Sequence, residues 1–185
     1  MPIGEEFPAV LEAARTGDEP AVARLFHDVH PTLLRWLRAL EPRAAEDVAA
    51  QTWLAVAERL GRFTGDEGAF RGWLFSVARR RLADHRRRAV REASRRSSLG
   101  YAGQPSGDDP ADEVVVRCEA ERAVALVRSV LPGEQAEVVL LRTLGGLTAA
   151  EVGRVVGRSP GAVRVLQHRA LRRLAEALDR QGAVT

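Results

Sequence analysis

Apolar residues recur at intervals of three and four along most of this 185-residue chain, and alternating patterns are scarce. This spacing predicts amphipathic helices and an all-α fold. In the N-terminal half the pattern predicts helices over 19–40, 44–60 and 70–85. Pro31 should kink or divide the first of them, because proline lacks a backbone donor.

The C-terminal half predicts helices over 119–131 and 134–144, followed by a helix-turn-helix. Thr148 and Glu151 match a capping box at the start of its first helix. Gly157 suits the end of that helix, and Ser159 suits the N-cap of the next. The second helix should bury one apolar stripe, made of Val163, Leu166, Ala170, Leu174 and Leu178.

This helix-turn-helix leaves polar and basic residues facing outward on its second helix, an arrangement that fits the major groove of duplex DNA. Arginine and glutamine carry donors that distinguish base pairs there. The alternative is an ordinary helical corner with a solvated basic face. The outward-facing candidates are Arg164, Gln167, His168 and Arg172, with Arg158 just before the helix.

The segment 97–110 is dense in Gly, Ser, Pro and Asp and reads as a flexible linker. The sequence therefore predicts two small helical bundles, over 5–92 and 118–182, joined by a flexible linker over 93–117.

The 28 basic residues are all arginine, and the net charge is only +3. Nine arginines nevertheless lie between Arg79 and Arg96, against two acids, and such a run favours an anionic partner. The single cysteine, Cys118, excludes a disulfide framework and a cysteine-based zinc site. No apolar run suits a membrane span, and the N-terminus does not resemble a signal peptide. We therefore expect a soluble, cytoplasmic protein without membrane insertion.

Aromatic and basic residues mix around the third predicted helix. Aromatic rings stack on unpaired bases while arginines follow the phosphates, so this mixture is typical of single-strand binding. The alternative is that the rings belong to the core, which we expect to be their main role for Phe70 and Trp73. The rings are Phe63, Phe70, Trp73 and Phe75, and the nearby cations are Arg71, Arg79, Arg80 and Arg81.

Enzyme chemistry finds little support. His27 and His30 stand three apart without a third His or Cys nearby, and neither a phosphate-binding GxxxxGK[ST] nor a GxSxG motif occurs. We expect no catalytic residue, no metal, no cofactor and no small-molecule substrate.

Three strings in order, AAEDVAAQTWLAV, RFTGDEGAFRGWLFSVARRRLADHRRR and LPGEQAEVVLLRTLGGLTAAEVGRVVGRSPGAVRVLQHRALRRL, resemble the extracytoplasmic-function (ECF) sigma factors of the sigma-70 family. The likeness covers region 2 at about 20–90 and region 4 at about 120–180. It implies a specificity subunit that binds core RNA polymerase and promoter DNA. It also implies an anti-sigma factor as a partner.

The resemblance also implies roles for residues. Asp47, Gln51 and Trp53 would contact the β′ clamp helices of the polymerase, and region 4 would contact the β flap. The minus-10 strand would meet Phe63, Arg71, Trp73, Arg79 and Arg80. The minus-35 duplex would meet the outward residues of the helix-turn-helix, namely Arg158, Ser159, Arg164, Gln167, His168 and Arg172.

The chain departs from the family pattern at Ala50, Arg80, Val165 and Leu166. These positions alter expected polymerase and promoter contacts without breaking the fold. Two further interpretations stay open at this point: a stand-alone helix-turn-helix regulator that binds duplex DNA without polymerase, and a helical adaptor for an acidic protein.

Overall fold

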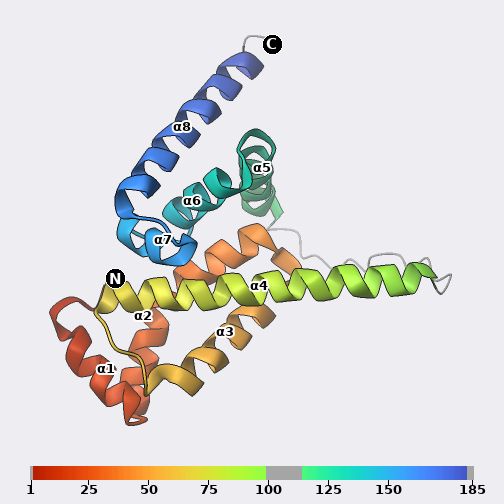
Figure 1. Cartoon of the computed structure of the whole chain (residues 1–185). Helices are drawn as coiled ribbons and strands as arrows, with labels where there is room; N and C mark the ends of the chain where they lie inside the picture. The colour runs from red at the N-terminus through yellow and green to blue at the C-terminus, as the bar shows by residue number, and fades with distance from the viewer. Residues whose placement is uncertain (1, 99–113, 183–185) are drawn as a thin grey trace.

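The computed structural model describes residues 2–98 and 114–182, and within these ranges it contains helices and no strand (Figure 1). The predicted all-α fold is confirmed. The elements are η1 (Gly4–Glu6), α1 (Phe7–Arg15), α2 (Glu19–Leu40), η2 (Pro42–Ala44), α3 (Ala45–Leu60), α4 (Glu67–Ser98), α5 (Val114–Val130), α6 (Gly133–Thr143), α7 (Ala149–Val156) and α8 (Pro160–Gly182).

Helix α2 begins where the Asp18 side chain accepts a hydrogen bond from the Ala21 backbone N–H at 2.9 Å. It runs unbroken through Pro31, so of the two expected effects of this residue, a kink or a division of the helix, the division does not occur. A continuous buried stripe on both sides of the proline, formed by Leu25, Val29, Leu33 and Leu37, outweighs the backbone bond that proline cannot make.

Helix α1 was not predicted. Phe7, Val10, Leu11 and Ala14 are buried, and the Phe7 ring lies 5.9 Å from that of Phe70. Their spacing of three, one and three residues is the helical signal that would have found this element.

Helix α4 is much longer than the predicted 70–85. Its buried residues end at Leu82, which is where the apolar pattern also ends. The helix continues because arginine and alanine have high helix propensity and no breaker intervenes before Ser98. The predicted linker range 93–117 thus contains the end of α4 and the beginning of α5.

The helix-turn-helix forms as its capping residues predict. The Glu151 backbone N–H donates to the Thr148 hydroxyl at 3.3 Å, and the Glu151 carboxylate accepts from the Thr148 backbone in return. Gly157 adopts φ +72°, and the Ser159 hydroxyl accepts from the Ala162 backbone N–H at 3.2 Å. One prediction for α8 is wrong: Leu178 is 51% exposed and Ala177 is buried instead, because this end of α8 projects past the other helices (Figure 1).

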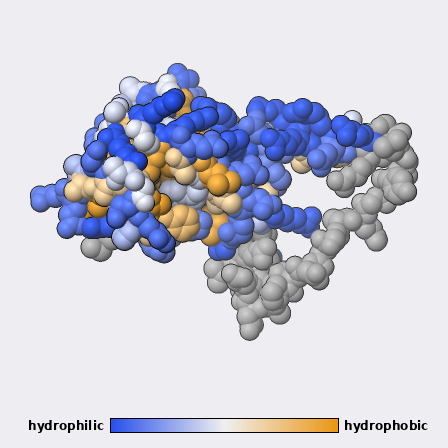
Figure 2. Space-filling model, turned by 90° about the horizontal axis from the view of Figure 1, so that it is seen from below, coloured by the Kyte–Doolittle hydropathy of each residue, from blue (hydrophilic) through white to orange (hydrophobic). Residues whose placement is uncertain are grey.

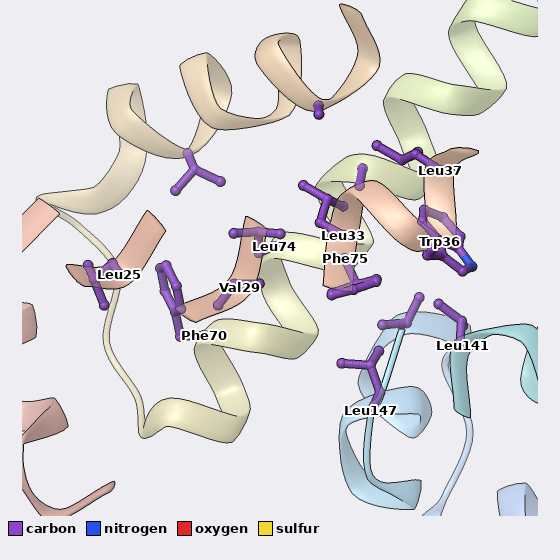
Figure 3. Close-up of a cluster of buried hydrophobic side chains, with 14 of the residues drawn as sticks. Leu25, Val29, Leu33, Trp36, Leu37, Phe70, Leu74, Phe75, Leu141 and Leu147 are labelled. Carbon is purple, nitrogen blue, oxygen red and sulfur yellow. The ribbon is translucent and has the colours of Figure 1, made fainter. Parts of the chain in front are cut away.

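We call the two predicted bundles, over 5–92 and 118–182, the first and second lobes. They share a hydrophobic core, which the sequence did not predict. Trp36, Phe75, Leu141 and Leu147 are all buried, and they converge from α2, α4, α6 and the segment before α7 (Figure 3). The Phe75 and Trp36 rings lie 5.6 Å apart, and a Cβ added at Gly145 would lie 3.0 Å from the Phe75 ring. Helix α7 therefore packs directly on α4.

Candidate nucleic-acid interface

The outward face of α8 offers several of the predicted duplex contacts to solvent. Arg164, His168 and Arg172 are exposed, with Arg172 only loosely paired to Glu176 at 3.5 Å. They follow one another at intervals of four, so they lie along one side of the helix. Val165 beside them is 50% exposed, which adds an apolar contact surface that sequence reasoning had treated only as a departure.

The remaining predicted residues of this lobe have internal partners. Gln167 is half-buried, and its amide oxygen accepts from Arg142 Nε at 3.1 Å. Arg158 Nε donates to Glu134 at 2.7 Å. Ser159 is occupied by its capping bond. These three groups therefore fix the start of α8, and Arg158 and Ser159 remain exposed whereas Gln167 is half-buried.

The aromatic residues of the first lobe divide into core and surface. Phe70 and Phe75 are fully buried, whereas Phe63 and Trp73 are half-buried. The Phe63 and Trp73 rings stack with centroids 4.9 Å apart and an angle of 19° between their planes. Gly65 permits the loop that carries Phe63, with φ +149°. This stacked pair is the part of the cluster available to an unpaired base.

Arg71 lies in an ion-pair network between the lobes. Its side chain is 13% exposed, with Nη1 3.2 Å from an Asp28 oxygen and Nε 3.5 Å from a Glu151 oxygen. The two carboxylates come from α2 and α7 and are 5% and 7% exposed. In this arrangement the guanidinium binds protein carboxylates, in a place where strand contact was expected.

Arg79 and Arg80 differ in whether a protein carboxylate binds their side chains. Arg79 makes a two-pronged ion pair with Glu137 of α6, whose second contact is 2.9 Å long, and this bond raises the pKa of Arg79 above its usual value. Arg80 is exposed and has no ion pair within the described residues. Of these two predicted strand contacts, Arg80 is thus the one whose guanidinium has no carboxylate partner among the described residues.

A cleft of about 1130 Å³ lies between the lobes, beside Arg79 and Arg80. Its walls combine apolar side chains such as Trp36 and Leu140 with further arginines. Burial, followed by the nearby Arg86, lowers the pKa of Arg128 in this wall. The carboxylates of Glu134 and Glu137 also line the cleft, so its walls carry charges of both signs beside the apolar side chains.

The exposed face of α3 combines polar and apolar groups. Asp47 and Gln51 are exposed, and Leu54, one turn further, is 66% exposed. Figure 2 shows apolar residues gathered on this side of the molecule and bordered by polar ones. Leu54 was missed by the sequence analysis, although its spacing from Asp47 and Gln51 places all three on one face.

Trp53 lies beside this face and not on it. It is half-buried, and its indole N–H donates to His30 Nδ1 at 3.3 Å. The Phe26 ring stacks on His30 at 4.2 Å. Burial lowers the pKa of His30, which favours the neutral imidazole that a hydrogen-bond acceptor at Nδ1 requires. Trp53 therefore anchors α3 to α2 through its contacts with His30 and Phe26.

Comparison with known proteins defines the class. Residues 25–92 match the family model of sigma-70 region 2, and residues 129–176 match that of sigma-70 region 4. The ECF RNA polymerase sigma factor ShbA of Streptomyces griseus is 35% identical, over 90% of this chain and 92% of its own. The chain belongs to the ECF sigma factors of the sigma-70 family.

Solved structures agree at the level of the fold. The structure of CnrH in complex with the cytosolic domain of CnrY is 22% identical and has a TM-score of 0.70, covering 95% of this chain and 98% of that one. The sigma factor RpoE of Bartonella quintana, bound to the anti-sigma factor NepR, is 20% identical with a TM-score of 0.60, covering 85% and 96%.

The described residues contain neither a helix suited to a membrane nor a three-residue metal-binding group. Among residues 2–98 and 114–182, no helix is long and apolar enough to cross a membrane. The same described residues contain no group of three His, Cys, Asp or Glu side chains placed to share a metal ion.

Proposed function

We propose that this protein binds core RNA polymerase and directs it to promoters by capturing the minus-10 strand and contacting the minus-35 duplex. One observation carries the proposal: a single chain matches sigma-70 region 2 and region 4 in order. Exposed basic side chains in each region support the DNA contacts that we propose. The first has a half-buried, stacked Phe63–Trp73 pair and an exposed Arg80 about two turns further along α4, and the second exposes the basic side of α8. The relatives are sigma factors and not catalysts.

Strand capture provides a physical route to promoter opening. A protein shifts an equilibrium only by its different affinity for the two states. Aromatic stacking contributes roughly 1–3 kcal/mol per base, which can offset the few kcal/mol that flipping a base costs. The Phe63–Trp73 pair would bind only separated strand, so its binding energy favours the open promoter.

The lobes must separate for this activity. Helix α7 covers the part of α4 that carries Arg71, and Glu137 occupies Arg79. We infer that promoter binding exchanges these carboxylates for DNA phosphates. The domains over 5–92 and 118–182 would then act as two units joined by the linker over 93–117.

Polymerase binding would use the exposed face of α3, with Asp47, Gln51 and Leu54 toward the β′ clamp helices, while region 4 contacts the β flap. The protein would act in the cytoplasm, where the polymerase is. An anti-sigma factor would hold it inactive, which predicts that the bound partner prevents association with core polymerase.

The test is gel filtration with purified core polymerase, followed by transcription from a promoter library. Co-elution and initiation at a shared sequence pair would support the proposal. An Asp47→Arg/Leu54→Asp variant should lose co-elution, and Glu5→Arg, an exposed charge change elsewhere, should retain it. Binding to a palindrome without polymerase would instead support the stand-alone regulator. If neither result is obtained, the remaining interpretation is a helical adaptor for an acidic protein.

A further inference from the structure

The second half of α4 projects from the molecule and has no assigned role. Figure 1 shows this end of the helix extending past the other helices, and Figure 2 shows it as a polar extension in a second view. Among the described side chains of α4, Leu82 is the last buried one, and every side chain from 87 to 95 is exposed. We call residues 87–95 the α4 arm.

The arm carries mostly positive charge. Arg88 and Arg91 lie on it without an ion pair to another element in the described structure. Arg87 is paired to Asp84 one turn earlier, and Glu92 is the only acid within the arm. Arg87 and Arg91 stand four apart, where like charges destabilise a helix.

The arm also lacks the packing that normally stabilises a protein helix. Most helical stability in proteins comes from burying an apolar face, and this segment buries none. Even Val90, its one large apolar residue, is 69% exposed. A polyanion would remove the charge repulsion and order the helix, so the chemistry of the arm favours a phosphate backbone.

The position of the arm indicates which phosphates of the promoter it would contact. The arm continues the helix that carries Trp73 and Arg80, and at 1.5 Å per residue Arg91 lies roughly 16 Å beyond Arg80 along the axis. It is also the last described element before the chain leads to the lobe that contacts the minus-35 duplex. In promoter DNA the spacer likewise lies between the minus-10 and minus-35 elements. The arm therefore has the same place along the chain that the spacer has along the DNA.

We propose that the α4 arm binds the backbone of the duplex spacer between the minus-10 and minus-35 elements. This inference rests on the proposed function. Arginine contacts to phosphate carry no base information, so the arm strengthens binding at all spacer sequences alike. It would also hold the spacer in line with the strand-capturing surface of the same continuous helix.

The experiment measures the salt dependence of promoter binding by the complete holoenzyme. Arg88→Gln/Arg91→Gln removes two charges and keeps good helix formers. The control, Arg24→Gln/Arg43→Gln, removes two exposed charges from other elements of the molecule, and one of them, Arg24, is paired to Glu6. The promoter is one recovered from the library, with and without neutral methylphosphonate linkages in the spacer.

The arm variant should lower the slope of log K against log salt by about 1.8, or about 0.9 for each lost phosphate contact. The control should leave the slope unchanged. A neutral spacer should lower the slope of the wild-type holoenzyme similarly and add little to the arm variant. An unchanged slope, or a loss that is the same on neutral and charged spacers, would overturn the proposal.

Co-elution with core polymerase and initiation by the wild-type protein separate the two levels of inference. If both occur and the arm variant matches wild type, only the spacer contact fails. If neither occurs, the proposed function itself fails.

Discussion

A covalent link between the lobes tests whether they must separate. A Cβ added at Gly72 of α4 would lie 3.2 Å from the Arg154 Cβ of α7. Disulfides usually place their Cβ atoms about 3.5–4.5 Å apart, so a shift of a few tenths of an ångström accommodates the bond. Gly72→Cys/Arg154→Cys in a Cys118→Ser background should therefore oxidise readily.

The expected magnitude follows from the loop that the disulfide closes. A loop of roughly 80 residues corresponds to about 4.5 kcal/mol of lost entropy in the unfolded chain. The cross-linked protein should unfold at higher denaturant concentration than its reduced form. More importantly, it cannot release Arg71 from Glu151, because α4 and α7 are then joined beside that ion pair.

The assay is promoter-specific transcription by holoenzyme made with oxidised protein, before and after adding a thiol reductant. Oxidised protein should be inactive, and reduction should restore activity. Each single-cysteine variant controls for the loss of Gly72 or Arg154 alone. Full transcription from completely cross-linked protein would refute the need for separation, and failure to cross-link would refute the packing of α7 on α4.

Three further changes test the interior. Arg71→Met should destabilise the protein by about 3–5 kcal/mol in urea unfolding, because it leaves the buried Asp28 and Glu151 carboxylates without their guanidinium; a loss under 1 kcal/mol would contradict the network. Phe75→Ala should cost about 3–5 kcal/mol in the same measurement by opening a cavity in the shared core, and a Phe75→Leu control should cost less. Because the folded protein lowers the pKa of His30, stability should be full above the unfolded value near 6.5 and fall as the pH drops below it; thermal unfolding from pH 7.5 to 5.5 would show this, and a His30→Gln variant should show less of it.

Local spacing accounts for the parts of the site that could be predicted. The capping box of Thr148 and Glu151 and the turn at Gly157 depend on residues only a few positions apart, so the helix-turn-helix was predicted nearly completely. The exposure of Arg164 and His168 follows from the same periodicity. The family resemblance, confirmed by both sigma-70 regions, depended on three such strings in order.

Longer-range choices were not accessible in this way. The family resemblance placed Arg71 where the minus-10 strand would pass, but the sequence could not show that Asp28 and Glu151 meet it there. Leu54 and Leu178 satisfy an apolar pattern and yet are exposed, because no neighbouring helix covers them. The length of α4 was underestimated because its apolar pattern ends long before its helix propensity does.

By itself, therefore, the sequence determined most of the helices, the caps of the helix-turn-helix and the family, since these depend on short-range geometry and on motifs in a fixed order. Only the tertiary structure decided that the two lobes share a core around Phe75, which arginines are neutralised by carboxylates and which are left to solvent. Those outcomes depend on which surfaces of distant segments meet, and the free energy of burying them is a property of both partners together.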